Sequence, residues 1–354
     1  MLSFNTNLIF NHFLKKKHLQ NAFLFILVSL IMIYLMEIGL YIISMKLREE
    51  NALKIIDNRS RLHVVRDFKK EKKYLFVAWY PKLFFIHSQM VKSKLKNYDE
   101  SGFLHDENSI FPLSGHSNSL RLNTNEDGQY LIYKTDKFGF NNDNYVYQKN
   151  KIDIILVGDS FVEGLGPSSN LNISKFLEKK NLNIINMGQQ GNGPLIQLAT
   201  IREYASKFKP KNVIWVFFEN DFDDLKRELS SKLLKQYLED DNFSQELLNK
   251  HNEIDNFLFS VNETLIECLE NEDVEIRNRK SADKIIGKIR RLFSLYYTRS
   301  VVKNILRPIY YDFFKAISEE NLEIFSEILA KSNEEVSKWG GKLVFVYIPD
   351  YNFK

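Results

Sequence analysis

The segment Ile152–Phe161, with the sequence IDIILVGDSF, decides the fold of this chain. Its first part is a short apolar run rich in β-branched residues, which is typical of a strand buried on both faces of a parallel sheet. The run stops at Gly158, and Asp159 and Ser160 follow at once. Because open α/β sheets hold their ligands just beyond the carboxyl ends of the strands, Ser160 occupies the position expected for a functional group.

Alternating strand and helix patterns extend from this segment toward the C-terminus. Predicted strands lie at 152–157, 183–187, 213–218 and 342–348, and predicted helices at 173–180, 195–208 and 319–339. The second helix ends before Pro210, which cannot continue a helix. Alternation of this kind predicts an α/β protein with a parallel sheet and helices on both faces.

Two regions depart from the alternating pattern. Residues 223–307 are charged and Leu-periodic without a convincing strand, which predicts a helical insertion that forms a cap or a partner surface. Its charged runs are interpreted as solvated faces. Residues 46–135 begin with a charged, helix-like stalk and continue as an irregular, partly β lead-in that we expect to pack on the main domain.

The N-terminal part of the chain contains a long apolar segment, residues 22–45, interrupted only by Glu37 and two serines. It is long enough to cross a bilayer, which takes about 20 residues. The lysines of 15–17 precede it, so we expect residues 1–21 in the cytoplasm and the rest of the chain outside, on the periplasmic side in a Gram-negative bacterium. A cleaved signal peptide is the alternative, but it requires an apolar core of only about 7–15 residues and an Ala-x-Ala-like site, and the segment meets neither condition. Glu37 is expected near the outer end of the helix, reaching the interface.

Composition excludes several classes of function. The chain has 354 residues, 44% of them hydrophobic, and a formal net charge of only +4. It has no basic cluster interleaved with aromatic residues, so nucleic-acid binding has no support. The single cysteine, Cys268, excludes a disulfide framework and a cysteine-based metal site. We expect neither a metal nor an organic cofactor.

Polar signatures follow each of the first three predicted strands. Ser160 follows the first strand, the run NMGQQGNG at 186–193 follows the second, and Phe218-Glu219-Asn220-Asp221 follows the third. Because the carboxyl ends of parallel strands meet at one edge of the sheet, we expect these groups to converge. Acyl transfer needs such a set, since a hydroxyl attacks the ester carbonyl and preorganised donors stabilise the resulting oxyanion.

In their order and spacing these residues resemble the SGNH hydrolase superfamily, also called GDSL-type esterases and lipases. The resemblance covers roughly 136–350, and it begins with the lead-in TDKFGFNN at 135–142. It implies that Ser160 is the nucleophile, and that Gly191 and Asn220 belong to the oxyanion hole. It also implies a flavodoxin-like three-layer α/β/α sandwich with five parallel strands, here an SGNH hydrolase-like domain over residues 136–354.

Each of these three residues also has a structural interpretation. Ser160 could simply close a tight turn between strand and helix, and Gly191 could be a turn glycine. Asn220 could form an Asx turn or an N-cap. Asp159 and Asp221 are interpreted as supporting residues that hold loops by hydrogen bonds, and neither is assigned as the triad acid.

The general base is missing from the pattern. The resemblance implies a histidine in an Asp-x-x-His motif after the last strands, but the last of the seven histidines is His251, and Asp350–Phe353 has Phe in the histidine position. The Asp-x-His motif of related polysaccharide O-acetyltransferases does not occur either. His116 could approach the site from the lead-in, or it is an ordinary loop histidine. The chain is therefore expected to be C-terminally truncated or naturally inactive, and the apolar strand 342–348, left as a bare edge, favours truncation.

The sequence thus predicts a membrane-anchored ester hydrolase or O-acyltransferase whose partners are the lipid bilayer, through residues 22–45, and an acyl ester. By family analogy the ester is an acetylated cell-envelope polysaccharide. The alternative is a catalytically inactive envelope protein of the same fold that binds glycan or a protein partner. A flavodoxin-type nucleotide binder is disfavoured, because residues 158–163 offer few amides for a phosphate.

Overall fold

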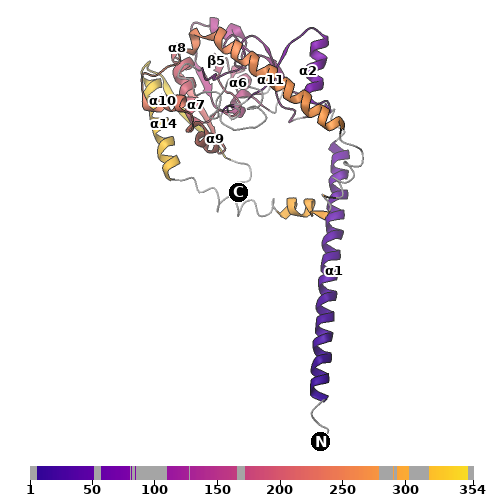
Figure 1. The fold of residues 1–354 in the computed structure, drawn as a ribbon. Helices are drawn as coiled ribbons and strands as arrows, with labels where there is room; N and C mark the ends of the chain where they lie inside the picture. Colours follow the sequence, from indigo (N-terminus) through magenta and orange to yellow (C-terminus); the bar gives the residue numbers. More distant parts are fainter. Residues whose placement is uncertain are drawn as a thin grey trace. The chain divides into compact units, whose positions relative to one another are not determined.

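The computed structural model describes residues 6–51, 57–79, 81, 84, 110–126, 128–165, 172–278, 290, 293–302 and 319–349. The chain forms two compact units. One comprises Met1–Lys54 and Arg277–Lys315, and the other comprises Ile55–Ile276 and Ala316–Lys354. The second unit contains the parallel sheet and the candidate site (Figure 1).

A parallel sheet forms the centre of the second unit. Its strands are β4 (Ile154–Val157), β5 (Ile184–Asn186), β6 (Asn212–Phe218) and β7 (Lys342–Ile348). They lie in the order β5-β4-β6-β7, and every pairing is parallel. This confirms the predicted α/β class. The described residues give this sheet four strands rather than the five that the family resemblance implies, and residues 350–354 lie outside them.

Helices cover both faces of the sheet. They are α5 (Ser160–Glu163), α6 (Ile173–Glu178), α7 (Pro194–Thr200), its continuation through η2 (Ile201–Ala205) into α8 (Ser206–Phe208), and α14 (Glu319–Ser337). The side chains of β4 alternate between the two faces: Ile154 and Leu156 pack with the α5 and α6 side, while Ile155 and Val157 pack with α7 and α14. The result is the predicted three-layer sandwich.

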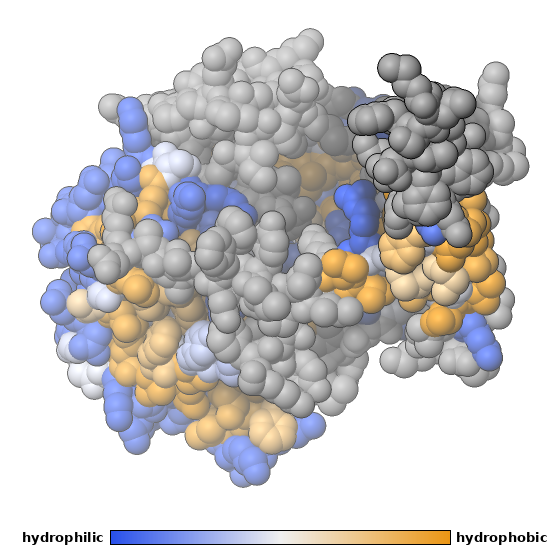
Figure 2. Space-filling model, turned by 90° about the horizontal axis from the view of Figure 1, so that it is seen from below, coloured by the Kyte–Doolittle hydropathy of each residue, from blue (hydrophilic) through white to orange (hydrophobic). Residues whose placement is uncertain are grey.

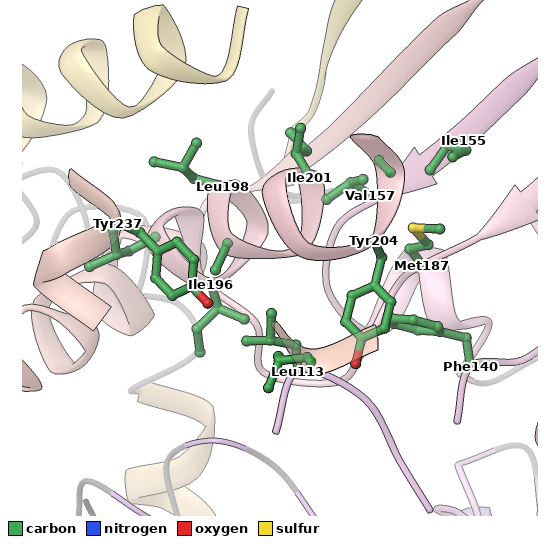
Figure 3. Packing of buried hydrophobic residues seen from close by; sticks show 14 of the residues in the cluster. Leu113, Phe140, Ile155, Val157, Met187, Ile196, Leu198, Ile201, Tyr204 and Tyr237 are labelled. Atoms are coloured by element: carbon green, nitrogen blue, oxygen red, sulfur yellow. The ribbon is translucent and has the colours of Figure 1, made fainter. Parts of the chain in front are cut away.

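The larger core lies on the α7 side of the sheet. Figure 3 shows Val157 of β4 near Ile201, and Tyr204 beside Phe140, whose rings meet edge to face at 5.2 Å. These side chains are almost completely buried. Burying an aliphatic or aromatic side chain of this size contributes roughly 1.5–3 kcal/mol, so this cluster fixes the position of α7 against the sheet.

The first part of the predicted insertion belongs to this core. It forms α9 (Asp221–Glu228), α10 (Lys232–Glu239), η3 (Leu247–Asn249) and α11 (His251–Asn278). Their leucine periodicity gives each helix one apolar face, and this face is buried against the sheet unit rather than standing apart as a cap. Residues from Arg277 to the end of the predicted insertion fall in the other unit.

The lead-in also packs on the main domain. It contains α2 (Arg61–Lys70), β1 (Leu75–Val77), β2 (Leu120–Leu122), β3 (Ile132–Lys134) and η1 (Asn144–Gln148). The order of its small sheet is β1-β2-β3, with one parallel and one antiparallel pairing. Side chains that follow these strands, among them Trp79, Leu113 and Phe140, enter the larger core. The lead-in is therefore a structural part of the sheet unit.

The first unit is built on α1 (Thr6–Asn51), a single helix of 46 residues. Within it, Asn21–Ser44 is long and apolar enough to cross a membrane, and only 6% of this segment is buried. Figure 2 shows apolar side chains, in orange, gathered where α1 is seen end-on. The same unit contains the short helical stretch 296–302.

Candidate active site

The three polar signatures meet at one edge of the sheet. Because β4 lies between β5 and β6, the loops after these two strands flank Ser160 on either side. Direct contacts join the three strand ends. The Gln189 N–H donates to the Gly158 carbonyl at 3.2 Å, and the rings of Phe161 and Phe218 lie 4.8 Å apart. Ser160 therefore stands at the centre of the convergence expected from the sequence.

Local geometry explains how Ser160 comes to begin a helix. The Asp159 side chain caps α5 by accepting from the Phe161 N–H at 3.0 Å, and Gly164 ends the helix with a φ of 92°. A Cβ at Gly158 would lie only 2.8 Å from the Val216 carbonyl oxygen, so a glycine is required there. The Ser160 hydroxyl is half-buried and donates to the Asp159 carboxylate at 3.3 Å.

Hydrogen bonds of the Asn186 side chain fix the loop after β5. Asn186 donates to the Val162 carbonyl at 2.5 Å and accepts from the Gly188 N–H at 2.9 Å. Gly188 approaches α5 so closely that a Cβ would lie 2.4 Å from the Glu163 nitrogen. Gly191 has a φ of 77°, a backbone conformation that other residues adopt only with strain. The conformation of Gly191 suits a turn glycine as well as an oxyanion donor.

Several buried polar atoms on this edge have no hydrogen-bond partner. Among the described residues they include the Asn220 Oδ1, the Asp221 Oδ1 and both terminal atoms of the Asn192 side chain. Asn220 occupies the N-cap position of α9, as its structural interpretation predicted, but its side chain makes no capping hydrogen bond. A buried polar group without a partner costs about 1–3 kcal/mol, so these atoms have hydrogen-bonding capacity that a polar ligand could use.

Two buried carboxyl groups lie beside the nucleophile position. Burial raises the pKa of Asp159 to about 6. Burial and the neighbouring Asp159 raise the pKa of Asp221 well above its usual range. Asp221 is held by Gln197, which donates to it at 3.2 Å and also to the Asn192 carbonyl at 2.8 Å. The two carboxyls therefore resist being ionised together.

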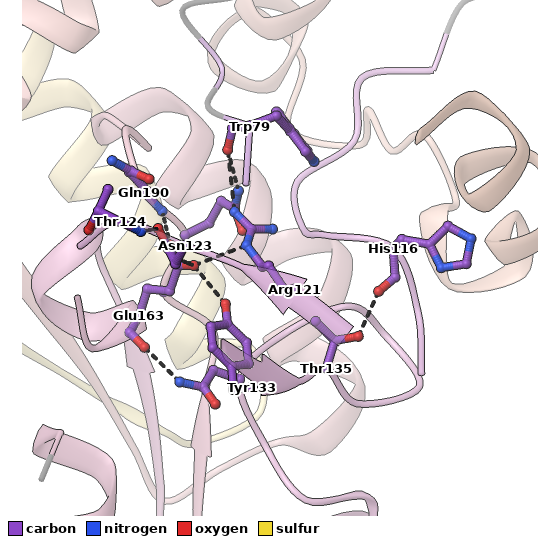
Figure 4. Close-up of polar contacts among 12 residues, drawn as sticks. Trp79, His116, Arg121, Asn123, Thr124, Tyr133, Thr135, Glu163 and Gln190 are labelled. Carbon is purple, nitrogen blue, oxygen red and sulfur yellow. Dashed lines mark hydrogen bonds and ion pairs between the residues drawn. The ribbon is translucent and has the colours of Figure 1, made fainter. Parts of the chain in front are cut away.

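Glu163 anchors the other end of α5 (Figure 4). Its Oε1 accepts from Asn123 at 2.8 Å and from the Tyr133 hydroxyl at 2.6 Å, and it lies 3.2 Å from the Arg121 Nε. Its Oε2 accepts from the Gln190 N–H at 2.5 Å. Glu163 is completely buried. The carboxylate thus ties β2 and β3 of the lead-in to α5 and to the loop that contains Gly191.

A second buried glutamate, Glu228 of α9, holds the start of α7. It accepts from the Gly193 N–H at 2.6 Å and from the Leu195 N–H at 2.9 Å. Burial and the neighbouring Asp224 raise the pKa of Glu228 to about 8. Neither Glu163 nor Glu228 was identified from the sequence. The available signal for Glu163 was its place between Ser160 and Gly164, where a charged residue enters a segment that must be buried.

The described histidine side chains are His63, His116 and His251. The Nδ1 of His116 lies 3.0 Å from the Ser117 carbonyl and 3.7 Å from the Asp255 carboxylate, and its ring stacks on Phe76. These contacts hold it against α11 and the lead-in. In this part of the chain, no hydrogen bond joins a histidine to Ser160. The segment Asp350–Phe353 lies outside the described residues.

Metal binding has no support within the described part of the chain, which contains no group of three or more His, Cys, Asp or Glu residues able to hold a metal ion. The site consists of a serine, a glycine-rich loop, an asparagine and buried carboxyls.

No protein-family model matches the chain, and no curated protein matches it. Among solved structures, a mutant of the esterase AlinE4 matches 34% of this chain and 74% of its own chain, with 17% sequence identity and a TM-score of 0.20. This similarity is too slight to assign an activity to the chain, so any functional conclusion has to rest on the residues of the site.

Proposed function

We propose that this chain is an SGNH-type serine ester hydrolase or O-acyltransferase anchored in a membrane. The observation that supports this most is the placement of Ser160 at the start of a helix on the carboxyl end of central β4. The Gly191 loop and Asn220 flank it from the two neighbouring strands. Nucleophile and oxyanion donors would then surround one point, which is the requirement for acyl transfer.

In this proposal the Ser160 hydroxyl attacks the acyl carbonyl of the substrate. The N–H groups of Ser160 and Gly191 and the side-chain amide of Asn220 stabilise the oxyanion. The unpartnered polar atoms leave room for further substrate contacts: the Asn192 Nδ2 could donate to a substrate oxygen, and the Oδ1 atoms of Asn192 and Asn220 could accept from a substrate hydroxyl. The substrate class is an acyl ester, for which an acetylated cell-envelope polysaccharide is the proposed source. Asn21–Ser44 would span the bilayer, with residues 1–21 in the cytoplasm.

A fluorophosphonate probe tests the nucleophile directly, since it reacts covalently with activated serine hydroxyls. We expect the full-length protein, in membranes of the cell that expresses it, to be labelled at Ser160. The Ser160→Ala variant should lose labelling, whereas Ser117→Ala, at a half-buried serine bonded to Asp255, should retain it. Labelling that survives Ser160→Ala would rule out Ser160 as the nucleophile.

The second candidate is an inactive envelope protein that uses the same site to bind glycan. It is favoured by one observation: no described histidine side chain is bonded to Ser160. The gene sequence beyond codon 354 distinguishes the two candidates, because an in-frame Asp-x-x-His motif there would supply the acid and the base. Binding of an acetylated polysaccharide without turnover or probe labelling would support the inactive protein.

A further inference from the structure

Glu37 is a fully buried carboxyl in the middle of an otherwise exposed apolar helix. Its two oxygens accept hydrogen bonds from successive backbone groups of the same unit. Oε1 accepts from the Tyr297 N–H at 2.8 Å, and Oε2 accepts from the Thr298 N–H at 2.6 Å. The first turn of the 296–302 helix is therefore capped by a side chain of α1.

The position of Glu37 along α1 determines where this contact occurs. Glu37 precedes Ser44, the end of the apolar segment, by seven residues, or about 10 Å at the helical rise of 1.5 Å per residue. The segment of 24 residues would be about 36 Å long, against a hydrocarbon core of about 30 Å. If α1 spans the bilayer, Glu37 and the N–H groups that it binds lie inside the edge of the hydrocarbon.

Inside hydrocarbon, the Glu37 carboxyl and the first N–H groups of the 296–302 helix each need a hydrogen-bond partner, and each supplies the partner of the other. A carboxyl in a membrane-spanning helix is costly unless it is hydrogen-bonded. The first N–H groups of any helix lack intrahelical partners, and hydrocarbon offers them none. The paired contact removes both costs and allows the 296–302 helix to lie within the membrane beside α1.

The exposed side chains of residues 293–302 are mostly apolar or aromatic, with Ser294, Arg299 and Ser300 as the polar ones. Phe293, the most exposed of these residues, is 71% exposed, although the edge of its ring meets Tyr34 of α1 at 6.2 Å. Tyr297 packs on Tyr41 of α1 at 5.5 Å. Further exposed apolar or aromatic side chains of the segment are Tyr296, Val301 and Val302. This exposed surface adjoins, through Tyr34 and Tyr41, the exposed apolar surface of α1.

We propose that residues 293–302 form a second membrane-contacting element, which lies in the leaflet at the C-terminal end of the α1 span and is locked there by Glu37. The inference rests on the proposed span of α1. The partner is the lipid bilayer. Aromatic residues favour the membrane–water interface, and the exposed Arg290 and Arg299 suit anionic headgroups. The chain thereby meets the membrane at two places far apart in its sequence.

Depth-dependent quenching of a fluorescent label tests this proposal in the full chain. Single-cysteine variants are made in a Cys268→Ser background and reconstituted into vesicles of phosphatidylethanolamine and phosphatidylglycerol. Phe293→Cys reports on the segment. Phe176→Cys, at a phenylalanine of α6 that is 60% exposed, is the matched aqueous control, and Val28→Cys, at a residue of α1 that is 49% exposed, is the membrane control.

We expect the labels at positions 28 and 293 to be quenched severalfold more by doxyl-labelled lipid than by aqueous iodide, and the label at 176 to show the reverse. If position 28 responds to lipid but 293 behaves like 176, the second element does not exist, although the anchor does. Protection of 293 from both quenchers would mean that a protein covers it, which also overturns the proposal. A label at 28 that responds only to iodide would refute the anchor itself.

The Glu37 lock is tested with the same label at position 293. Glu37→Leu removes both acceptors, so we expect lipid quenching at 293 to fall at least twofold and iodide quenching to rise. Glu37→Gln keeps one acceptor oxygen and should have a smaller effect. Quenching at position 28 should not change in either variant. If Glu37→Leu leaves quenching at 293 unchanged, Glu37 does not hold the segment.

Discussion

The two flanks of Ser160 are built differently. Toward the lead-in, Glu163 receives a donor on each carboxylate oxygen and pairs with Arg121, so the buried charge is well compensated. Toward the start of α7 and the loop after β6, both terminal atoms of the Asn192 side chain and the Oδ1 atoms of Asn220 and Asp221 are buried without a partner among the described residues. The Glu163 carboxylate is thus fully bonded, although the Trp79 Nε1 and Thr124 Oγ1 near it have no partner in the described part of the chain, whereas the polar side chains of the other flank retain unused hydrogen-bonding capacity.

We interpret this difference as a division of roles, in which one flank of Ser160 supports the structure and the other could bind a ligand. The fully bonded Glu163 carboxylate fixes the position of α5 and of the Gly191 loop, as a preorganised site requires. The unsatisfied flank costs stability in the isolated chain and gains hydrogen bonds when a polar ligand enters. Changes on the supporting flank should therefore unfold the protein, whereas changes on the binding flank should affect ligand and probe reactions and leave folding almost unaffected.

The largest expected effect is that of Glu163→Ala. The substitution leaves the Arg121 guanidinium buried without its carboxylate and releases the Gln190 N–H. Removing one partner of a buried ion pair typically costs about 3–5 kcal/mol. We expect a loss of this size in the free energy of unfolding, measured by chemical denaturation of the full chain in detergent.

A paired variant serves as the control for this prediction. Glu163→Leu combined with Arg121→Met removes both charges, so it should destabilise the protein less than Glu163→Ala does. If Glu163→Ala lowers the free energy of unfolding by less than about 1 kcal/mol, the network does not support the site, and the contrast between the two flanks is lost.

The next effect is a pH dependence of the free energy of unfolding that comes from Asp159, next to Ser160. Asp159 has a pKa of about 6 in the folded protein, against about 3.9 in an unfolded chain. A raised carboxyl pKa contributes stability that is fully present below the unfolded value and is lost as the pH rises through the folded value. We expect the free energy of unfolding to fall by up to about 3 kcal/mol between pH 4 and pH 7.

Asp159→Asn isolates this contribution. An asparagine can still accept from the Phe161 N–H but does not ionise beside Asp221. The variant should therefore lose a measurable part of the decline in stability between pH 4 and pH 7. A decline of unchanged size would assign the titration to other buried carboxyls, such as Glu228, whose pKa is also raised.

Much of the fold could be predicted from the sequence because its signals are local. The apolar run before Gly158, the proline after the second helix and the repeated strand–helix alternation each depend on neighbouring residues. Every strand and helix predicted between residues 152 and 348 is present, with each end within two residues of the prediction. The convergence at Ser160 followed from topology alone, because parallel strand ends share one edge.

What could not be predicted depends on contacts between distant segments. Glu163 binds Asn123 and Tyr133, which lie 40 and 30 residues away in the sequence. Glu37 binds Tyr297 from 260 residues away. Each was a single charged residue in an apolar segment. The sequence pattern indicates that burying such a charge is costly, but it does not identify the group that binds the charge. The leucine periodicity after Asp223 likewise predicted helices with an apolar face. It did not predict that this face would pack into the main core.

The smallest effects come from a matched pair of buried asparagines. Asn123 donates to Glu163 at 2.8 Å and accepts from the Thr124 N–H at 2.9 Å, whereas the side chain of Asn192 has no hydrogen-bond partner in the part of the chain that the structure describes. Asn123→Leu should therefore lower the free energy of unfolding by about 1–3 kcal/mol, because it leaves buried groups unpaired. Asn192→Leu removes only unpaired atoms and should change it by less than about 1 kcal/mol, in either direction.

Probe labelling of the same two variants completes the comparison. Asn192→Leu should fold normally, yet it should slow fluorophosphonate labelling of Ser160, because the leucine removes polar atoms from the flank that would meet the ligand. The conservative variant Asn192→Gln restores an amide and should recover part of the labelling rate. If Asn192→Leu instead destabilises the chain as much as Asn123→Leu, the Asn192 side chain contributes to folding, and the two flanks of Ser160 are both structural.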